Sequence, residues 1–184
     1  MIKQQKQAPF LFSKVSHYFG RYSVPMIFLF APFLLALSVG SLAPEFSARN
    51  QDGKEIHLSD FKGKFVLIYF YPKDDTPGCT KEACEFRDKY STLKKMNTVV
   101  LGVSRQDEKS HQKFKAKHHL PFDLLVDQDG SLSKAFGVSS MPLIGLTHRQ
   151  SILIGPNGKV IQFYSDVDPS HHTKEVIEEI KKAS

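Results

Sequence analysis

The run from Phe65 to Tyr71 is the segment that most constrains the fold of this chain. It reads F-V-L-I-Y-F-Y, contains no charged residue, and is rich in the β-branched and aromatic residues that favour strands. A short apolar run without alternation is typical of a strand buried on both faces, and Pro72 ends it. We therefore expect a sheet that contains this strand in its interior and is covered on both sides.

Helix and strand patterns alternate after this run. We expect helices at 77–95, 107–118, 132–136 and 169–182, and further strands at 98–103 and 124–126. Asp-Gly and Asn-Gly turns predict hairpins that join 46–48 to 56–58 and 150–154 to 159–164. Asp168 or Ser170 is expected to cap the last helix. This order predicts one α/β domain over residues 41–184, with a central mixed sheet flanked by helices.

Residues 1–40 form a basic and hydrophobic extension, and residues 24–40 contain no charge. Basic residues before an apolar segment resemble a secretory signal or a short membrane anchor. The apolar segment is short for a membrane span, and Pro25 and Pro32 weaken a straight helix. Two alternatives stay open. Residues 24–40 contact a membrane or direct export, or the folded domain is cytoplasmic and the extension is an apolar appendage or a mis-assigned start.

The distribution of charge argues against a nucleic-acid partner. The net charge is +6, but residues 1–40 contribute +4 of it, which leaves 21 basic and 19 acidic residues in the remainder. Basic residues of a nucleic-acid-binding protein should cluster on the folded domain. We therefore expect no nucleic-acid binding by residues 41–184.

Cys79 and Cys84 are the two cysteines of the chain. Two cysteines cannot form a disulfide framework for a domain of this size, and four-ligand zinc motifs need more sulfur or suitably spaced histidines. The pairs His118–His119 and His171–His172 are adjacent residues, whose side chains diverge on a helix, so we interpret them as solvated. The close cysteine pair therefore indicates reactivity rather than a structural or metal-binding role.

Cys79 falls in the first turn of the helix expected from Pro77, directly after a loop that follows the buried strand. Free N–H groups and the helix dipole stabilise a thiolate at such a position. A helix end supplies about 0.3–1 kcal/mol, whereas lowering the ordinary thiol pKa of about 8.5 by two takes about 2.7 kcal/mol. A cation or further donors must therefore assist, and the hydroxyl of Thr76 can point back at the sulfur or toward the oxygen of a bound substrate.

Cys84 follows Cys79 by five residues on the same expected helix. In an intact α-helix the Cα atoms of such residues lie about 8.6 Å apart, whereas a disulfide needs roughly 4.4–6.8 Å. If the two sulfurs join, the first turns of the helix must therefore unwind. The alternative is that both cysteines are small core residues, because free cysteine is often buried.

The loop and helix together carry a motif of high specificity. Pro72, Thr76 and Cys79 match Pro-x-x-x-Thr-x-x-Cys, and residues 79–88 match its extension Cys-Thr-x-Glu-Ala-Cys-x-Phe-Arg-Asp. On these residues the sequence resembles the peroxiredoxins, specifically the bacterioferritin-comigratory or Q-type group. The similarity runs through most of residues 37–184.

The resemblance implies a thioredoxin-like fold, no metal or organic cofactor, and reduction of hydroperoxides through a sulfenic acid on Cys79. It implies that Cys84 is the resolving cysteine, that Pro72 and Thr76 shape the site, and that Arg149 contacts the peroxidatic sulfur. Arg149 would supply the cation required above. The implied partners are a hydroperoxide and thioredoxin or a similar dithiol, with either a monomer or a dimer as the assembly.

Two other functions are compatible with a close cysteine pair. A thiol–disulfide oxidoreductase of the thioredoxin type would carry Cys-x-x-Cys, whereas four residues separate the cysteines here. A membrane-attached scaffold with structural cysteines would need no reactive thiol at Cys79. Insulin reduction without peroxide would favour the first, and slow alkylation of Cys79 would favour the second.

Overall fold

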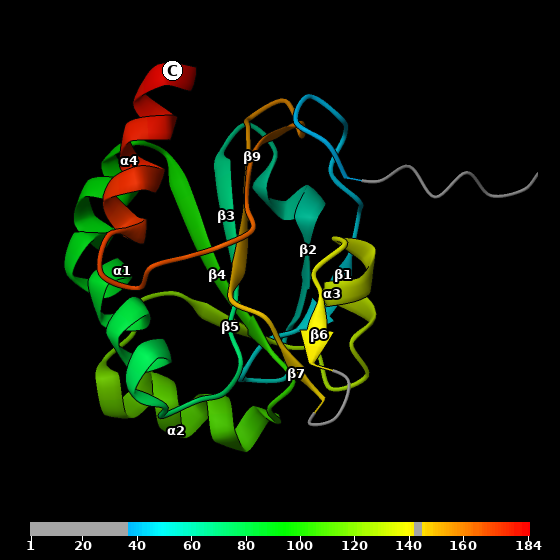
Figure 1. Cartoon of the computed structure of the whole chain (residues 1–184), viewed down its shortest axis with the longest axis vertical. Coiled ribbons are helices and arrows are strands. Elements are labelled where there is room, and N and C mark those ends of the chain that lie inside the picture. The colour runs from blue at the N-terminus through cyan, green and yellow to red at the C-terminus, as the bar shows by residue number, and fades with distance from the viewer. Residues whose placement is uncertain (1–36, 142–144) are drawn as a thin grey trace, which may run out of the picture. The chain divides into compact units, whose positions relative to one another are not determined.

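The computed structural model describes residues 37–141 and 145–184 (Figure 1). The strands of these residues are β1 (Ser47–Arg49), β2 (Glu55–His57), β3 (Phe65–Phe70), β4 (Thr98–Ser104), β5 (Asp123–Val126), β6 (Ser140–Met141), β7 (Leu146–Thr147), β8 (Gln150–Ile154) and β9 (Val160–Tyr164). The helices are η1, a 3-10 helix (Leu58–Phe61), α1 (Pro77–Lys95), α2 (Glu108–His118), α3 (Ser131–Ala135) and α4 (His172–Ala183). The expected strand at 65–71, the helix at 77–95 and both hairpins are confirmed, with small shifts at their ends.

The central sheet has the order β5-β4-β3-β8-β9. Strand β3 pairs in parallel with β4 and antiparallel with β8, so the sheet is mixed, as predicted. Every residue of β3 is buried, which is the environment that its unbroken apolar sequence indicated. Because β3 is the middle strand, the loop that follows it emerges at the centre of one end of the sheet.

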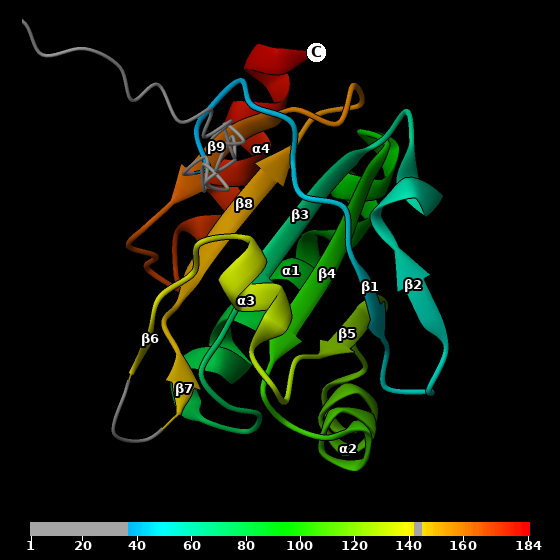
Figure 2. The same cartoon turned by 90° about the vertical axis from the view of Figure 1, so that its right-hand side faces the viewer.

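Two hydrophobic clusters cover the two faces of the sheet. Alternate residues of β3 point to opposite sides, as the two-residue period of a strand requires. Leu67, Tyr69 and Tyr71 pack with helices α1, α2 and α4, whereas Ile68 and Phe70 pack on the side of β1, β2 and α3. Figures 1 and 2 show these two layers on either side of the strands.

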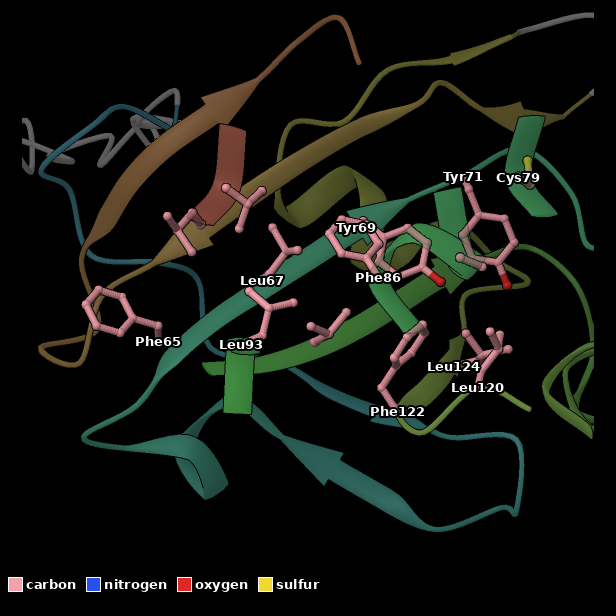
Figure 3. Packing of buried hydrophobic residues seen from close by; sticks show 14 of the residues in the cluster. Phe65, Leu67, Tyr69, Tyr71, Cys79, Phe86, Leu93, Leu120, Phe122 and Leu124 are labelled. Atoms are coloured by element: carbon pink, nitrogen blue, oxygen red, sulfur yellow. The ribbon is translucent and has the colours of Figure 1, made fainter. Parts of the chain in front are cut away.

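The cluster beneath α1 reaches from one end of the sheet to the other. Figure 3 shows Phe65 at one end of this cluster and Tyr71 with Cys79 at the other. Phe86 fills the middle, with its ring centroid 5.1 Å from that of Tyr69. The helix that bears both cysteines is therefore anchored to the sheet by its own buried residues.

The last helix begins later than the sequence predicted. The side chain of Asp168 accepts a hydrogen bond from the Ser170 N–H at 2.8 Å, and its carbonyl oxygen accepts from the N–H groups of His171 and His172. This turn places the N-cap at His171 and the first helical residue at His172. Neither Asp168 nor Ser170 is the cap, because the turn that Asp168 forms comes before the helix.

Contacts with the domain begin before residue 41. Leu37 packs against the cluster under α3, and the Gly40 N–H donates to the Val160 carbonyl at 2.8 Å. Most of the extension expected at 1–40 lies outside the described residues. Among the residues that the structure does describe, no helix has both the length and the apolar character that a membrane span requires.

Candidate active site

The site lies where β3 ends and α1 begins. The Tyr71 N–H still donates to Val103 of the neighbouring strand, and the loop 72–76 then leads to Pro77 at the first position of α1. Proline suits that position because its fixed φ is helical and no N–H is needed there. Cys79 is the third helical residue and is only 1% exposed. Its sulfur thus lies at the positive end of a long helix, among apolar side chains.

Arg149 reaches this sulfur from the start of β8. Its Nη2 donates a hydrogen bond to Cys79 Sγ at 3.3 Å. Antiparallel pairing with β3 places Gln150 opposite Phe70, so Arg149 lies level with the residue that follows β3. The cation expected from the energy of thiolate formation is therefore in contact with the sulfur.

Gly78 leaves room for this contact. A Cβ atom at residue 78 would lie 3.1 Å from Nη2 of Arg149, closer than side chains normally approach. A larger residue would therefore push the guanidinium away from Cys79. Glycine therefore suits position 78 for a steric reason, because the guanidinium of Arg149, a residue distant in the sequence, lies close to it.

Glu82 completes the group around Arg149. It is fully buried, lies one turn after Cys79 on the same face of α1, and forms an ion pair with Nη1 of Arg149. Its side chain points into the protein although it carries a carboxyl group. The guanidinium thus bridges two residues of one helical turn, and Glu82 fixes its orientation.

Thr76 and Pro72 define the loop before Cys79. Thr76 is the N-cap of α1 with an extended backbone, and its hydroxyl donates to the Lys73 carbonyl at 3.0 Å rather than to the sulfur. The oxygen of that hydroxyl keeps its lone pairs for an incoming donor. Pro72 is half-buried at the start of the loop. Of the two directions expected for the Thr76 hydroxyl, the structure does not show the one toward the sulfur, and the one toward a bound substrate stays a prediction.

A buried polar network holds the same loop from below. Asp74 Oδ1 accepts a hydrogen bond from the Tyr71 hydroxyl at 2.7 Å. Its Oδ2 accepts one from the Ser110 hydroxyl at 2.6 Å and lies 2.9 Å from His111 Nδ1. The other ring nitrogen of His111 faces the Leu125 carbonyl at 3.2 Å. Sequence reasoning missed this network, because residues 74 and 111 share no local pattern.

Cys84 lies on the intact helix and is half-buried. Both cysteines are free, and α1 continues without interruption from Pro77 to Lys95. This is the arrangement in which the two sulfurs cannot join without unwinding. The structure therefore represents the dithiol form of the segment.

The histidine pairs divide into exposed and packed members. His119 and His171 are exposed, as expected, but His118 is half-buried and His172 is fully buried. His172 Nε2 lies 2.9 Å from the Ser151 hydroxyl, and burial, followed by the charge of Arg149, lowers its pKa to about 4. Solvation was thus the wrong interpretation for His172, because α4 begins there and turns its first side chain inward.

Comparison with known proteins identifies the family. The family model of the AhpC/TSA family matches residues 39–163. The chain belongs to this family. Peroxiredoxin Q of Suaeda salsa chloroplasts is 43% identical over 80% of this chain and 69% of its own length, and peroxiredoxin Bcp of Bacillus subtilis is 38% identical over 82% and 99%. The bacterioferritin comigratory protein of Xanthomonas campestris has a solved structure with a TM-score of 0.70 and 33% identity, covering 75% of this chain and 91% of that one.

These similarities make the chain a Q-type peroxiredoxin with a thioredoxin-like fold, as its cysteine motif indicated. A peroxiredoxin is a thiol-dependent peroxidase, an oxidoreductase with an antioxidant function. The assignment agrees with the geometry of this peroxiredoxin, in which a buried cysteine at a helix start contacts a guanidinium.

Glu82 gives this peroxiredoxin a pH-dependent element of stability. Burial raises the pKa of Glu82 to about 7, while Arg149 opposes the rise. Because the folded protein holds this proton more tightly than the unfolded chain, the stability that Glu82 contributes is greatest below its usual pKa and is lost as the pH rises through about 7. Chemical denaturation gives the free energy of unfolding of each protein. From about pH 5 to about pH 8, the value for wild type should therefore fall relative to the value for Glu82→Gln. An identical difference at both pH values would contradict this.

Proposed function

We propose that this peroxiredoxin reduces hydroperoxides with Cys79 as the attacking sulfur. The observation that carries the proposal is the 3.3 Å contact between Arg149 Nη2 and Cys79 Sγ at the start of α1. A thiolate is the reactive form of cysteine, and a permanent positive charge together with free helix N–H groups favours it. The same groups can hold the negative charge that forms on the leaving oxygen.

The reaction begins with the Cys79 thiolate attacking the terminal oxygen of the O–O bond. An S–O bond forms and the O–O bond breaks, which leaves a sulfenic acid and an alkoxide or hydroxide that takes up a proton. Arg149 contacts both the sulfur and the departing oxygen, since its planar fork offers several donors. The Thr76 hydroxyl oxygen accepts a hydrogen bond from the O–H group of the hydroperoxide, because its own proton is donated to the Lys73 carbonyl.

Cys84 resolves the sulfenic acid. Its thiolate attacks the Cys79 sulfur, so that an S–S bond forms and the S–O bond breaks. The hydroxide that leaves takes up the proton released by the Cys84 thiol and becomes water. The first turns of α1 unwind to bring the two cysteines within disulfide range. A dithiol such as thioredoxin then supplies two electrons and restores both thiols by disulfide exchange.

The substrates include alkyl hydroperoxides as well as hydrogen peroxide. The Xanthomonas protein has been studied for its alkyl peroxide reduction activity. Membrane contact through residues 24–40 belongs to this proposal as well, supported by their uncharged sequence after a basic segment.

The full chain should consume hydrogen peroxide and cumene hydroperoxide continuously when thioredoxin, thioredoxin reductase and NADPH are supplied. Without thioredoxin it should consume about one equivalent per chain and stop, because one disulfide forms per chain. The rate of NADPH oxidation at several peroxide concentrations measures this. Reduction of insulin without any peroxide consumption would instead support a thiol–disulfide oxidoreductase and refute the proposal.

A further inference from the structure

Helix α2 contacts the chain on both sides of the two cysteines. Before them, Asp75 Oδ1 lies 2.9 Å from His118 Nε2 and 3.0 Å from Lys117 Nζ. After them, Arg87 Nη1 donates to the main-chain carbonyl of His118 at 2.9 Å. One residue at the end of α2 therefore holds Asp75 and Arg87 at the same time, and these two residues bracket Cys79 and Cys84.

Helix α2 is itself held by side chains that are buried in the core. It runs across the end of the sheet at which β4 stops (Figure 1). Phe114 is fully buried in the cluster beneath the helices, and its ring lies 5.0 Å from that of His118. His111 is also fully buried and bonds Asp74 and the Leu125 carbonyl. The His118 contacts thus attach the cysteine segment to a helix whose inner side chains are buried in the core.

The third turn of α1 is held from two directions. Phe86 is fully buried, with ring centroids 5.1 Å from Tyr69 and 5.5 Å from His172. Arg87, the next residue, points away from this cluster, and its Nη1 donates a hydrogen bond to the His118 carbonyl. By contrast, the hydrogen bonds of the two turns before it are those that must break before Cys79 and Cys84 can approach.

We propose that Asp75 and Arg87, held by His118, are positioning residues that confine unwinding of α1 to residues 76–86. The inference rests on the proposed disulfide between Cys79 and Cys84. In the oxidised protein, residues before Asp75 and after Phe86 keep their reduced-form structure. The Phe86 side chain stays in the core, and only its N–H loses its helical partner, the carbonyl of residue 82. Arg87 ends the unwound segment because leaving the His118 carbonyl would break a hydrogen bond to a charged donor.

This boundary also affects the redox equilibrium. Without Arg87, unwinding spreads along α1 in the disulfide form only. The disulfide form therefore gains conformational entropy that the dithiol form does not gain. The equilibrium with dithiothreitol should then shift about three- to tenfold toward the disulfide. A substitution that merely weakened the fold would affect both forms alike and would leave this ratio unchanged.

Amide hydrogen exchange of wild type and Arg87→Met, in reduced and oxidised forms, tests the boundary directly. In oxidised wild type, fast exchange should be limited to residues 76–86. In oxidised Arg87→Met it should extend to residues 88–91, with exchange at least about tenfold faster there. Arg87→Lys should restore the boundary in part, because a lysine can still donate to the His118 carbonyl.

Two variants serve as matched controls. Asp88→Asn removes the ion pair that Arg87 Nε forms at 2.8 Å and leaves the His118 bond in place, so the boundary should not move. Asp75→Asn tests the boundary before Cys79. Asparagine tolerates the positive φ of residue 75, and the substitution should shift the equilibrium with dithiothreitol about two- to fivefold toward the disulfide. Its control, Asp123→Asn, removes the partner of Lys115 on α2 but touches neither end of the cysteine segment.

An unchanged boundary in Arg87→Met, or fast exchange beyond Arg87 in oxidised wild type, would overturn the proposal. If wild type forms no Cys79–Cys84 disulfide, the proposed resolving step fails, and the reduced forms still decide the boundary. In reduced wild type, residues 77–86 should open separately from residues 88–95, and in reduced Arg87→Met the two stretches should open together. Joint opening in reduced wild type would also overturn it.

Discussion

Replacing Cys79 with Ser should lower peroxide turnover by at least about 10³-fold. A serine hydroxyl is almost entirely protonated at neutral pH and cannot accept an oxygen atom as sulfur does. The substitution is nearly isosteric at a fully buried position, so the fold should persist. Steady-state consumption of hydrogen peroxide with thioredoxin present, together with a thermal melt, measures both effects.

Cys84→Ser is the matched control for this experiment. It changes the other cysteine of the same helix and leaves the contact between Arg149 and Cys79 in place. This variant should consume one equivalent of peroxide and then stop, because no disulfide forms for thioredoxin to reduce. Full turnover in Cys79→Ser would show that another group attacks the peroxide.

Replacing Arg149 with Met should slow the reaction of Cys79 with peroxide by about 10²–10³-fold. The change removes the charged donor at 3.3 Å from the sulfur and leaves Glu82 buried without its partner. The loss should appear in the second-order rate constant with peroxide, measured by stopped flow on the reduced protein. Part of it should also appear as lower stability, since an unpaired buried carboxylate is costly.

Two further variants separate charge from geometry at Arg149. Arg149→Lys keeps the positive charge but loses the planar fork that contacts Cys79 and Glu82 together, so its rate should lie between wild type and Arg149→Met. Arg49→Met removes an exposed arginine from β1 and should leave the rate unchanged. A wild-type rate constant in Arg149→Met would exclude the guanidinium from the chemistry.

The strands and helices near the cysteines could be predicted because their signals are local. The apolar run of β3 and the Pro77 start of α1 each depend on neighbouring residues, and the structure has them within a residue of the expected bounds. Cys79 was placed at a helix start on the same grounds. The late start of α4 could not be predicted, because Asp168 can form either a cap or a separate turn.

The partners of polar residues could not be predicted in this way. Glu82 has the spacing of a residue on the same helix face as Cys79, but its burial depends on Arg149, which follows far later in the chain. Asp74 and His111 meet only because α2 crosses the end of the sheet. No local pattern indicates such pairs, since hydrogen bonding between distant residues leaves no period in the sequence.

Arg149 is the instructive intermediate case. Energy considerations required a cation near Cys79, but only the resemblance to Q-type peroxiredoxins indicated which residue. The structure supplies the physical reason, because β8 pairs antiparallel to β3 and so brings its first residues beside the start of α1. The contact between Arg149 and Cys79 depends on the register of β8 against β3, which no local pattern in the sequence indicates.

The most direct test of the account is the intact mass of the reduced full chain after one equivalent of hydrogen peroxide. The account predicts the loss of two hydrogen atoms, with peptide mapping that joins Cys79 to Cys84 and leaves the methionines unchanged. A chain of unchanged mass whose Cys79 still reacts with an alkylating reagent would contradict it.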